Sequence, residues 1–259
     1  MKKFLALLLV LVLSVTMLAA CGEKKGNTFT VGFDATFPPY GYRDEATGEY
    51  VGFDLDLAAE VCARNDWKLV KQPIDWDSKD MELSSGTIDC IWNGFTMTGR
   101  EDEYAFTKPY VDNTQVFVVA ADSGITTHAD LAGKNVGVQA DSSALSALES
   151  EDCAALKASL GSMQQFPEYE TAFLNLESGA IDAVALDIGV ADYQLEKRGS
   201  GFVMLADPLS TEQYGVGFKL GNEALRDQVQ ATLDEMVEDG KFAEIAEKWG
   251  LSDMVCLGK

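Results

Sequence analysis

Short apolar runs alternate with amphipathic stretches along almost the whole chain from residue 28 onwards. The apolar runs predict strands at 29–33, 50–53, 88–92, 116–121, 136–138, 180–186 and 215–220. Apolar residues spaced three and four apart predict helices from about 54, at 78–85, 142–149, 171–178 and 188–197, and at 223–238 and 242–249. Strands and helices that alternate in this way are typical of an α/β architecture.

One local pattern occurs twice. Residues 85–91 read S-G-T-I-D-C-I, and residues 178–184 read S-G-A-I-D-A-V. In both, a helix is expected to end at the glycine, and a strand to begin through the Ile-Asp pair. This repetition indicates one strand-entry device that is used once in each of two similar lobes.

The first twenty residues have the pattern of an export signal. Lys2 and Lys3 precede an almost wholly apolar stretch, 4–18, which is shorter than a transmembrane helix of about 20 residues. The following Leu-Ala-Ala-Cys resembles a bacterial lipobox, which implies a lipoprotein that is cleaved before Cys21 and anchored to the cell membrane by acyl chains such as palmitate on that residue. An ordinary signal peptide with a chance cysteine is the alternative. Residues 21–27 are polar enough to serve as a tether.

The chain is strongly acidic. It has 20 Lys and Arg against 42 Asp and Glu, and loss of the export signal leaves 18 against 42, a formal charge of −24. Such a surface disfavours nucleic acids and anionic lipid headgroups, and it mildly favours cationic solutes. A solvated acidic coat explains it equally well. The 239 residues left after cleavage suffice for two lobes, each with its own core.

Cysteine and histidine give no catalytic pattern. Cys62 and Cys90 lie in apolar stretches and are expected to be buried free thiols, whereas pairing of Cys153 with Cys256 stays open. The spacings match no zinc or redox motif. The single histidine, His128, lies in a predicted turn, and no Ser/His/Asp set or phosphate loop is visible. We therefore expect no metal, no cofactor and no enzymatic activity.

The most constrained stretch runs from 31 to 65. An apolar strand leads to Asp34 and a proline-stiffened loop, and then Gly-Phe-Asp-Leu-Asp-Leu at 52–57 opens a helix with Val61, Cys62 and Asn65. This arrangement resembles the polar-amino-acid family of bacterial solute-binding proteins, which includes glutamine-, histidine- and lysine/arginine/ornithine-binding proteins. The resemblance covers nearly all of the chain after the export signal.

The resemblance implies a two-lobed, type II periplasmic-binding-protein-like fold. Each lobe would be a mixed sheet flanked by helices, and the chain would cross between the lobes twice. The first lobe would comprise residues 28–112 plus 211–259, and the second residues 113–210. The crossings would lie near 110–114 and 207–213, with Pro208 in the second.

A free amino acid presents a carboxylate, an ammonium and a side chain. Removing both charges from water is costly unless each finds a partner, so a receptor needs a cation or helix N-terminus, a carboxylate and apolar walls. The resemblance assigns the carboxylate to Arg100, although Arg100 comes one residue earlier than the usual spacing after the Thr-x-Thr loop. It assigns the ammonium to Asp187, which could alternatively be a plain helix cap.

The other positions that match ligand contacts come from both halves of the chain. They are Asp34, Phe37, Trp76, Asn93, Gly94, Thr96, Gln139, Ser142 and Ser143. Phe37 and Trp76 would sandwich the ligand side chain, with ordinary core packing as the alternative. Ser142 and Ser143 open a helix whose N–H groups would reach the carboxylate, or they are simple caps. Gln139 stands where glutamine-binding relatives carry a lysine, which favours basic over acidic ligands.

The resulting hypothesis is a lipid-anchored, monomeric substrate-binding protein on the outer side of the cell membrane. It would capture a free polar, and by its charges possibly basic, amino acid in the cleft and deliver it to an ABC permease and ATPase. The alternatives are a surface lipoprotein that senses amino acids or mediates adhesion, and an enzyme on the same fold. Asp54 would support the site without contacting the ligand.

Overall fold

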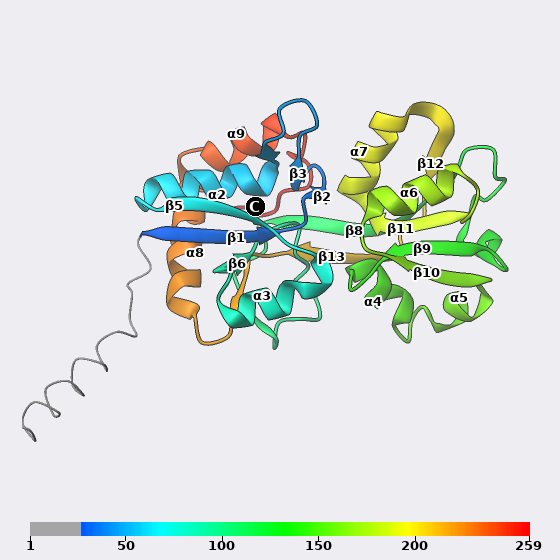
Figure 1. Cartoon of the computed structure of the whole chain (residues 1–259), viewed down its shortest axis with the longest axis horizontal. Helices are drawn as coiled ribbons and strands as arrows, with labels where there is room; N and C mark the ends of the chain where they lie inside the picture. Colours follow the sequence, from blue (N-terminus) through cyan, green and yellow to red (C-terminus); the bar gives the residue numbers. More distant parts are fainter. Residues whose placement is uncertain (1–26) are drawn as a thin grey trace, which may run out of the picture.

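The computed structural model describes residues 27–259. The export signal, the lipidation site Cys21 and all but the last residue of the tether lie outside the described residues. Within them the chain forms two α/β lobes that lie side by side and are joined by two neighbouring strands (Figure 1). None of the described helices combines the length and apolar character needed to cross a bilayer.

The first lobe is built on a five-stranded mixed sheet with the order β5-β1-β6-β14-β7. Its strands are β1 (Thr28–Phe33), β5 (Lys68–Pro73), β6 (Cys90–Ile91), β7 (Tyr104–Phe106) and β14 (Gly217–Lys219). β1 pairs in parallel with β5 and β6, whereas β14 is antiparallel to β6 and β7. A small sheet of β2 (Thr36–Phe37), β3 (Gly41–Arg43) and β4 (Tyr50–Val51) forms the proline-containing loop after β1.

The second lobe has the sheet order β10-β9-β11-β8-β12. Its strands are β8 (Val111–Ala120), β9 (Asn135–Gln139), β10 (Ser162–Phe166), β11 (Ala183–Asp187) and β12 (Phe202–Met204). β13 (Ser210–Tyr214) pairs with the first half of β8, from Val111 to Gln115, so the two connecting strands run antiparallel beside each other. This ladder forms the hinge region (Figure 1).

Helices cover both sheets. The first lobe carries α2 (Phe53–Arg64), α3 (Lys79–Ser85), α8 (Glu223–Glu238) and α9 (Lys241–Lys248). The second carries α4 (Ser143–Glu149), α5 (Ala154–Ser159), α6 (Tyr169–Glu177) and α7 (Ile188–Arg198), with α4 and α5 on one side of the sheet and α6 and α7 on the other (Figure 1). Three short 3₁₀ turns lie at Trp76–Ser78, His128–Leu131 and Gly199–Gly201.

The repeated sequence pattern builds the same structure in both lobes. Gly86 ends α3 at φ 77°, and Gly179 follows α6 at φ 74°, a left-handed conformation that glycine adopts without strain. Asp89 and Asp182 then each exchange two hydrogen bonds with the backbone of a neighbouring strand, the first with Thr30 and the second with Asn135, all of 2.8 Å.

The isoleucines of the same pattern cover a glycine in each sheet. A Cβ on Gly32 would lie 2.4 Å from Ile88 Cδ1, and one on Gly137 would lie 2.5 Å from Ile181 Cδ1. Each glycine therefore makes room for the isoleucine that follows the helix. The four described cysteines after the tether are all free thiols, so Cys153 and Cys256 are not paired.

Candidate functional site

A small cavity lies between the two lobes. Its eight lining residues are Phe37, Trp76, Asn93, Gly94, Gln139, Ser142, Ser143 and Asp187. All eight are positions that the sequence predicted to contact a ligand. The other three predicted residues lie beside it: Asp34 is hydrogen-bonded to Gln139, and Thr96 and Arg100 line the next opening.

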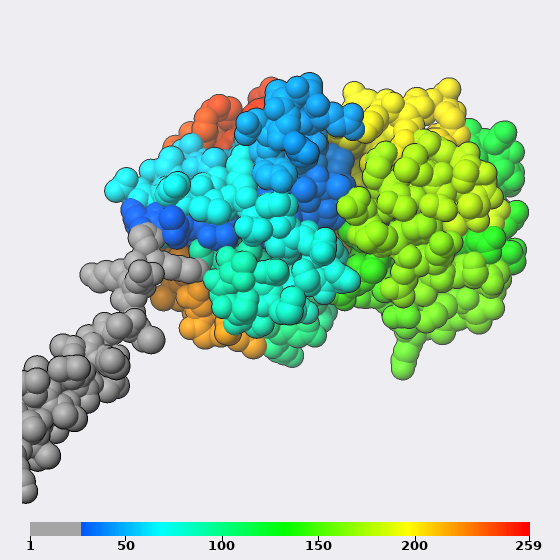
Figure 2. All heavy atoms as spheres, viewed as in Figure 1, coloured from blue at the N-terminus to red at the C-terminus, as the bar shows by residue number. Residues whose placement is uncertain are grey.

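The lobes are closed on this cavity. Its volume is about 10 Å³, close to what one water molecule requires. Gln139 Nε2 donates to Asp34 Oδ2 across the cleft at 2.7 Å, and Ser143 Oγ donates to Thr96 Oγ1 at 2.7 Å. Figure 2 shows the two lobes abutting on one face of the molecule. The closed cavity has no room for a molecule larger than water.

Asp187 ends β11 with its carboxylate buried, at 4% exposure. Three donors converge on Oδ1: the Tyr214 hydroxyl at 2.5 Å, Gln115 Nε2 at 2.7 Å and Asn113 Nδ2 at 2.8 Å. No described residue donates a hydrogen bond to Oδ2. Although Asp187 precedes α7, its side chain does not cap that helix. Burial, and then the charge of Glu212, raise the pKa of Asp187 to about 7.

Asp34 follows β1 and is also buried. Its backbone N–H donates to Asn93 Oδ1 at 3.0 Å, and the backbone N–H and hydroxyl of Thr36 donate to Asp34 Oδ1 at 2.8 and 2.7 Å. Burial raises the pKa of Asp34, and the hydrogen bonds from Thr36 and Gln139 partly offset this effect. The carboxylate is thus rigidly held beside the cavity.

Gly94 needs to be a glycine because its backbone has φ 56° and lies close to two rings. A Cβ there would lie 2.8 Å from Phe37 Cε1 and 3.1 Å from the Tyr214 ring. The Gly94 N–H donates to Asp54 Oδ2 at 2.6 Å, and the Tyr110 hydroxyl donates to the same oxygen at 2.9 Å. Burial raises the pKa of Asp54 to about 7. Asp54 fixes this loop from behind, as expected.

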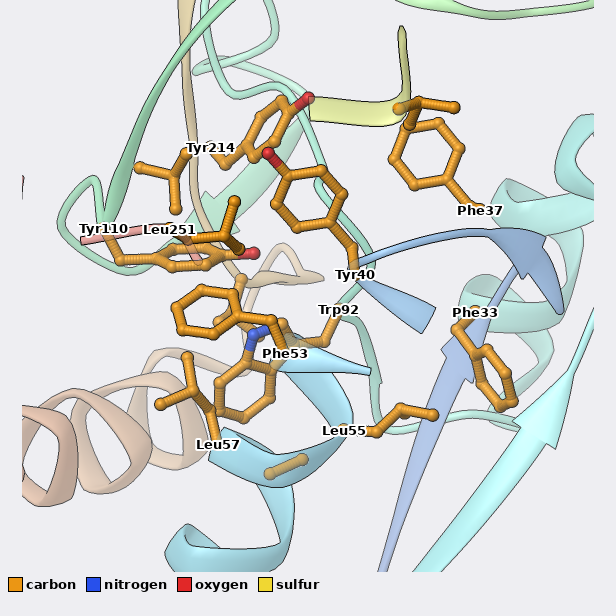
Figure 3. Packing of buried hydrophobic residues seen from close by; sticks show 14 of the residues in the cluster. Phe33, Phe37, Tyr40, Phe53, Leu55, Leu57, Trp92, Tyr110, Tyr214 and Leu251 are labelled. Atoms are coloured by element: carbon orange, nitrogen blue, oxygen red, sulfur yellow. The ribbon is translucent and has the colours of Figure 1, made fainter. Parts of the chain in front are cut away.

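The two predicted aromatic walls differ in burial. Phe37 is buried and packs against Tyr40 and Tyr169, with ring centroids 5.7 and 6.1 Å away. Figure 3 shows Phe37 beside Tyr40, whose ring meets Tyr214 edge-on at 5.2 Å. Trp76 is only partly buried and meets Phe95 edge-on at 5.7 Å. Both rings belong to packed clusters and also line the cavity.

Arg100 lies at the rim of the cavity. Gly99 has φ 81°, and the Arg100 N–H donates to the Met97 carbonyl at 2.9 Å, so the chain makes a tight turn from Met97 to Arg100. The guanidinium Nη1 lies 3.2 Å from the Thr96 carbonyl and 3.5 Å from Ser143 Oγ. This position brings it to the edge of the other lobe.

The loop from Gln139 to Ser143 leads into α4, and its two serines have different roles. Ser142 is a true cap, because its Oγ accepts the Leu145 N–H at 3.2 Å. Ser143 instead reaches across the cleft to Thr96. Asp141, which directly precedes Ser142, has φ 55°, a conformation in which glycine is the least strained residue.

A second, acidic hollow of about 220 Å³ adjoins the cavity and shares Trp76 with it. Four carboxyl groups line it, from Asp34, Asp75, Asp77 and Glu168. Burial and the charges of Asp34 and Asp75 raise the pKa of Glu168. The described residues contain no cluster of His, Cys, Asp and Glu that could hold a metal ion.

Sequence reasoning missed two charged residues in the cleft, Glu212 and Lys79. Glu212 Oε1 accepts hydrogen bonds from Thr96 Oγ1, Asn113 Nδ2 and Gln115 Nε2 at 2.8, 2.7 and 2.8 Å. The available signal was a period of two: Asn113 and Gln115 share one face of β8, and Glu212 and Tyr214 share one face of β13. When two strands pair and each carries polar residues at alternate positions, these residues are expected to form one shared polar face.

Lys79, at the start of α3, is 2% exposed and forms an ion pair with Asp141 of the other lobe. Its Nζ also lies 5.2 Å from the centre of the Trp76 ring. The contact joins two lobes, so it exists only in the closed form.

Breaking this ion pair is expected to favour the open form. Lys79→Met and Asp141→Asn should each weaken affinity for the ligand about 5- to 30-fold, since the contact contributes about 1 to 2 kcal/mol to closure. Small-angle scattering of the ligand-free variants should show a larger radius of gyration. Lys157→Met, which breaks the Lys157–Glu149 pair within the second lobe, is the matched control. If both variants kept the wild-type affinity and radius of gyration, the Lys79–Asp141 ion pair would have no part in closing the lobes.

The chain is similar to known proteins over most of its length. The sequence profile of bacterial extracellular solute-binding proteins, family 3, matches residues 29–252. The chain is 31% identical to the L-cystine-binding protein TcyA of Bacillus subtilis (strain 168) over 274 aligned positions, which cover 96% of this chain and 97% of the relative.

Solved structures show the same fold. The substrate-binding protein of an ABC uptake transporter from Streptococcus pneumoniae, crystallised with bound histidine, superimposes with a TM-score of 0.84 at 36% identity, covering 88% of this chain and 94% of that one. An ancestral arginine-binding protein bound to arginine gives a TM-score of 0.79 at 36% identity, covering 86% of this chain and 98% of that one. The fold is therefore the type II periplasmic-binding-protein fold, and the chain belongs to family 3 of the bacterial extracellular solute-binding proteins.

Proposed function

We propose that this protein captures a free amino acid with a basic side chain in the interlobe cleft and delivers it to an ABC importer. The acidic hollow beside Trp76 is the main observation that supports a basic side chain on the ligand. Relatives that bind cystine, histidine and arginine support the wider class of ligand. The protein acts as a receptor rather than an enzyme.

The α-groups of the ligand find opposite charges on opposite lobes. Asp187 of the second lobe leaves Oδ2 without a donor from the described residues and lines the cavity, which suits an ammonium. Arg100 of the first lobe lies at the rim next to Ser143, where a carboxylate would meet both the guanidinium and the hydroxyl. Closure thus brings each charge of the zwitterion to its partner and excludes water from both.

The side chain of the ligand would extend between Phe37 and Trp76 towards the acidic hollow. Four carboxyl groups within one hollow repel one another, and a cation relieves this repulsion. Trp76 can add a cation–π contact, because its indole face is the strongest of the aromatic groups for this interaction. A neutral or acidic side chain would leave the carboxylates without compensation, so we expect basic amino acids to bind more tightly.

The location follows from the N-terminal sequence and the family. The lipobox-like segment ending at Cys21 is the basis for a lipid anchor, and the polar tether would hold the lobes outside the cell membrane beside the permease. Two extended strands form the hinge, so closing can proceed as a rigid-body rotation of one lobe. A monomer suffices, since both lobes that contact the ligand come from one chain.

A ligand panel tests the proposal. The purified protein is heated with each of the twenty amino acids and with ornithine, citrulline and cystine, and the unfolding temperature is recorded. Arginine, lysine, ornithine or protonated histidine should raise it by several degrees, because a ligand at 100 times its Kd stabilises the folded state by about 2.7 kcal/mol. Citrulline, which has the shape of arginine without the charge, is the matched control. Equal shifts with citrulline and arginine would contradict the acidic hollow as the side-chain site.

A further inference from the structure

Asp187 and Glu212 are joined by the same two amide groups. Asn113 Nδ2 donates to Asp187 Oδ1 at 2.8 Å and to Glu212 Oε1 at 2.7 Å. Gln115 Nε2 donates to the same oxygens at 2.7 and 2.8 Å. An amide nitrogen has two hydrogens, so each amide uses both of them to bridge the carboxyl groups. The bridge thus links Asp187, at the end of β11, to Glu212 on the hinge strand β13.

Glu212 is also connected to both lobes. Ser143 Oγ of the second lobe donates to Thr96 Oγ1 of the first lobe, and Thr96 Oγ1 donates to Glu212 Oε1 at 2.8 Å. Glu212 and Arg100 line one opening of about 500 Å³. Thr96 and Ser143, which are predicted ligand contacts, line the same opening. A ligand that contacts Asp187 and Arg100 therefore lies within reach of Glu212.

No hydrogen bond to this pair comes from a positively charged group of the described residues. Every donor that the described residues offer to the two carboxyl groups is a neutral amide or hydroxyl. The ionisable groups that face them are the hydroxyls of Tyr214 on the hinge, Tyr40 on the first lobe and Tyr169 on the second, with Arg100 at the opening. Burial raises the pKa of all three tyrosines well above 10, so these hydroxyls stay neutral at physiological pH.

The charges of Asp54 and Asp192 also help to raise the pKa of the Tyr40 hydroxyl. Two adjacent carboxyl groups that share donors and lack a cation hold a proton more firmly than either would alone. In agreement, the charge of Glu212 adds to burial in raising the pKa of Asp187.

We infer that Asp187 and Glu212 together form the ammonium site, and that the ligand ammonium displaces to solvent the proton that this pair holds. The ammonium keeps its three protons and donates N–H···O hydrogen bonds, while the carboxyl O–H bond breaks and its proton passes to the buffer. This inference rests on the proposed function, because it requires a ligand with an ammonium group. Glu212 thereby sets the pH range in which the receptor loads.

The sign of the pH effect follows directly. Only the deprotonated pair binds the ammonium well, so affinity falls as pH decreases below about 7, by up to tenfold per pH unit. Glu212→Gln keeps an oxygen that can accept the same hydrogen bonds but removes the neighbouring charge. The pH at which affinity begins to fall should then move down by about 1 to 3 units.

Calorimetry tests this with the amino acid that gives the largest thermal shift. Titrations at pH 6 in buffers of different ionisation enthalpy should show release of most of one proton by the wild type and much less by Glu212→Gln. Glu235→Gln, which alters an exposed residue of α8, should behave as the wild type. Binding by the wild type without proton release, and with affinity constant from pH 5.5 to 8.5, would overturn the inference while leaving the proposed function intact.

The wild-type titration decides the question even when Glu212→Gln fails to fold. Equal proton release by folded Glu212→Gln and wild type would also overturn the inference, since Glu212 would then have no part in holding the proton. Absence of any amino acid ligand would instead contradict the proposed function, and with it the inference.

Discussion

Asp187→Asn is expected to abolish tight amino acid binding and to stabilise the ligand-free protein above pH 7. Asparagine can accept the three hydrogen bonds that Asp187 Oδ1 receives, but it offers no charge to an ammonium. Truncating one partner of a buried charge pair costs at least 2 to 5 kcal/mol in binding, so the affinity should fall by more than about 100-fold. The same change removes an unpaired buried charge from the closed cleft.

The stability effect has a defined pH dependence. The pKa of Asp187 is raised from 3.8 to about 7, so the folded protein binds more protons than the unfolded chain between about pH 4 and 7. Its contribution to stability is therefore highest below pH 4 and is lost as pH rises through 7, where ionisation costs about 4 kcal/mol. Urea unfolding should show Asp187→Asn to be more stable than the wild type at pH 8, with the two close together at pH 4.

A control separates this effect from a general change of charge. Asp122→Asn alters an exposed residue of the second lobe and should change neither unfolding nor binding. A lower stability of Asp187→Asn at pH 8 would show that the ionised carboxylate is stabilised in the closed protein. Retained wild-type affinity would show that the ligand ammonium has another partner.

Sequence analysis missed the strands at both ends of the two large sheets, besides β13 and the short strands β2 and β3. β5 and β7 end the first sheet, and β10 and β12 end the second. β5 reads K-L-V-K-Q-P and β10 reads S-M-Q-Q-F, so neither has the continuous apolar run of the buried central strands. An edge strand faces water along one side and is commonly protected by charged or polar residues. Its identity is set by the neighbouring strand rather than by its own pattern.

The long helix α8 shows the opposite case. Its sixteen residues carry a clear amphipathic period, and the predicted range 223–238 matches the observed helix.

The bounds of the short central strands were harder to predict. β6 is limited to Cys90–Ile91, whereas the apolar pattern predicted 88–92, because Ile88 packs onto Gly32 instead of pairing. The predicted strand at 180–186 likewise begins only at Ala183, since Ala180 and Ile181 still bond to the end of α6.

The residues of the candidate site also differ in whether the sequence alone could identify them. Residues in local motifs, such as Gly94 in its loop or Asp187 at the end of a strand, could be selected from the sequence because the family resemblance fixes their positions. Glu212 and Lys79 could not, because their role comes from partners more than 60 residues away. Asn113 and Gln115 meet Glu212 only through the pairing of β8 with β13, which the sequence does not specify.

Arg100→Ala is expected to weaken amino acid binding about 30-fold or more and to leave the free energy of unfolding within about 1 kcal/mol of the wild type. In the ligand-free protein the guanidinium donates to the Thr96 carbonyl at 3.2 Å, lies 3.5 Å from the Ser143 hydroxyl and lies 5.3 Å from the centre of the Phe95 ring, and it forms no ion pair with a described residue, so its removal costs little stability. With ligand present it would form a charge-assisted pair with the carboxylate, whose loss costs 2 to 5 kcal/mol. Calorimetry and urea unfolding measure the two quantities separately.

The decarboxylated amine of the preferred ligand shows whether this loss concerns the carboxylate. The wild type should bind the amine weakly, and Arg100→Ala should bind it no worse than the wild type does, because the interaction is already missing. Arg64→Ala, which breaks surface ion pairs with Glu60 and Asp239 far along α2, should retain full affinity for the amino acid. An equal loss of amine affinity in Arg100→Ala would instead assign Arg100 to closing the lobes through Ser143, and the carboxylate would then depend on the N–H groups at the start of α4.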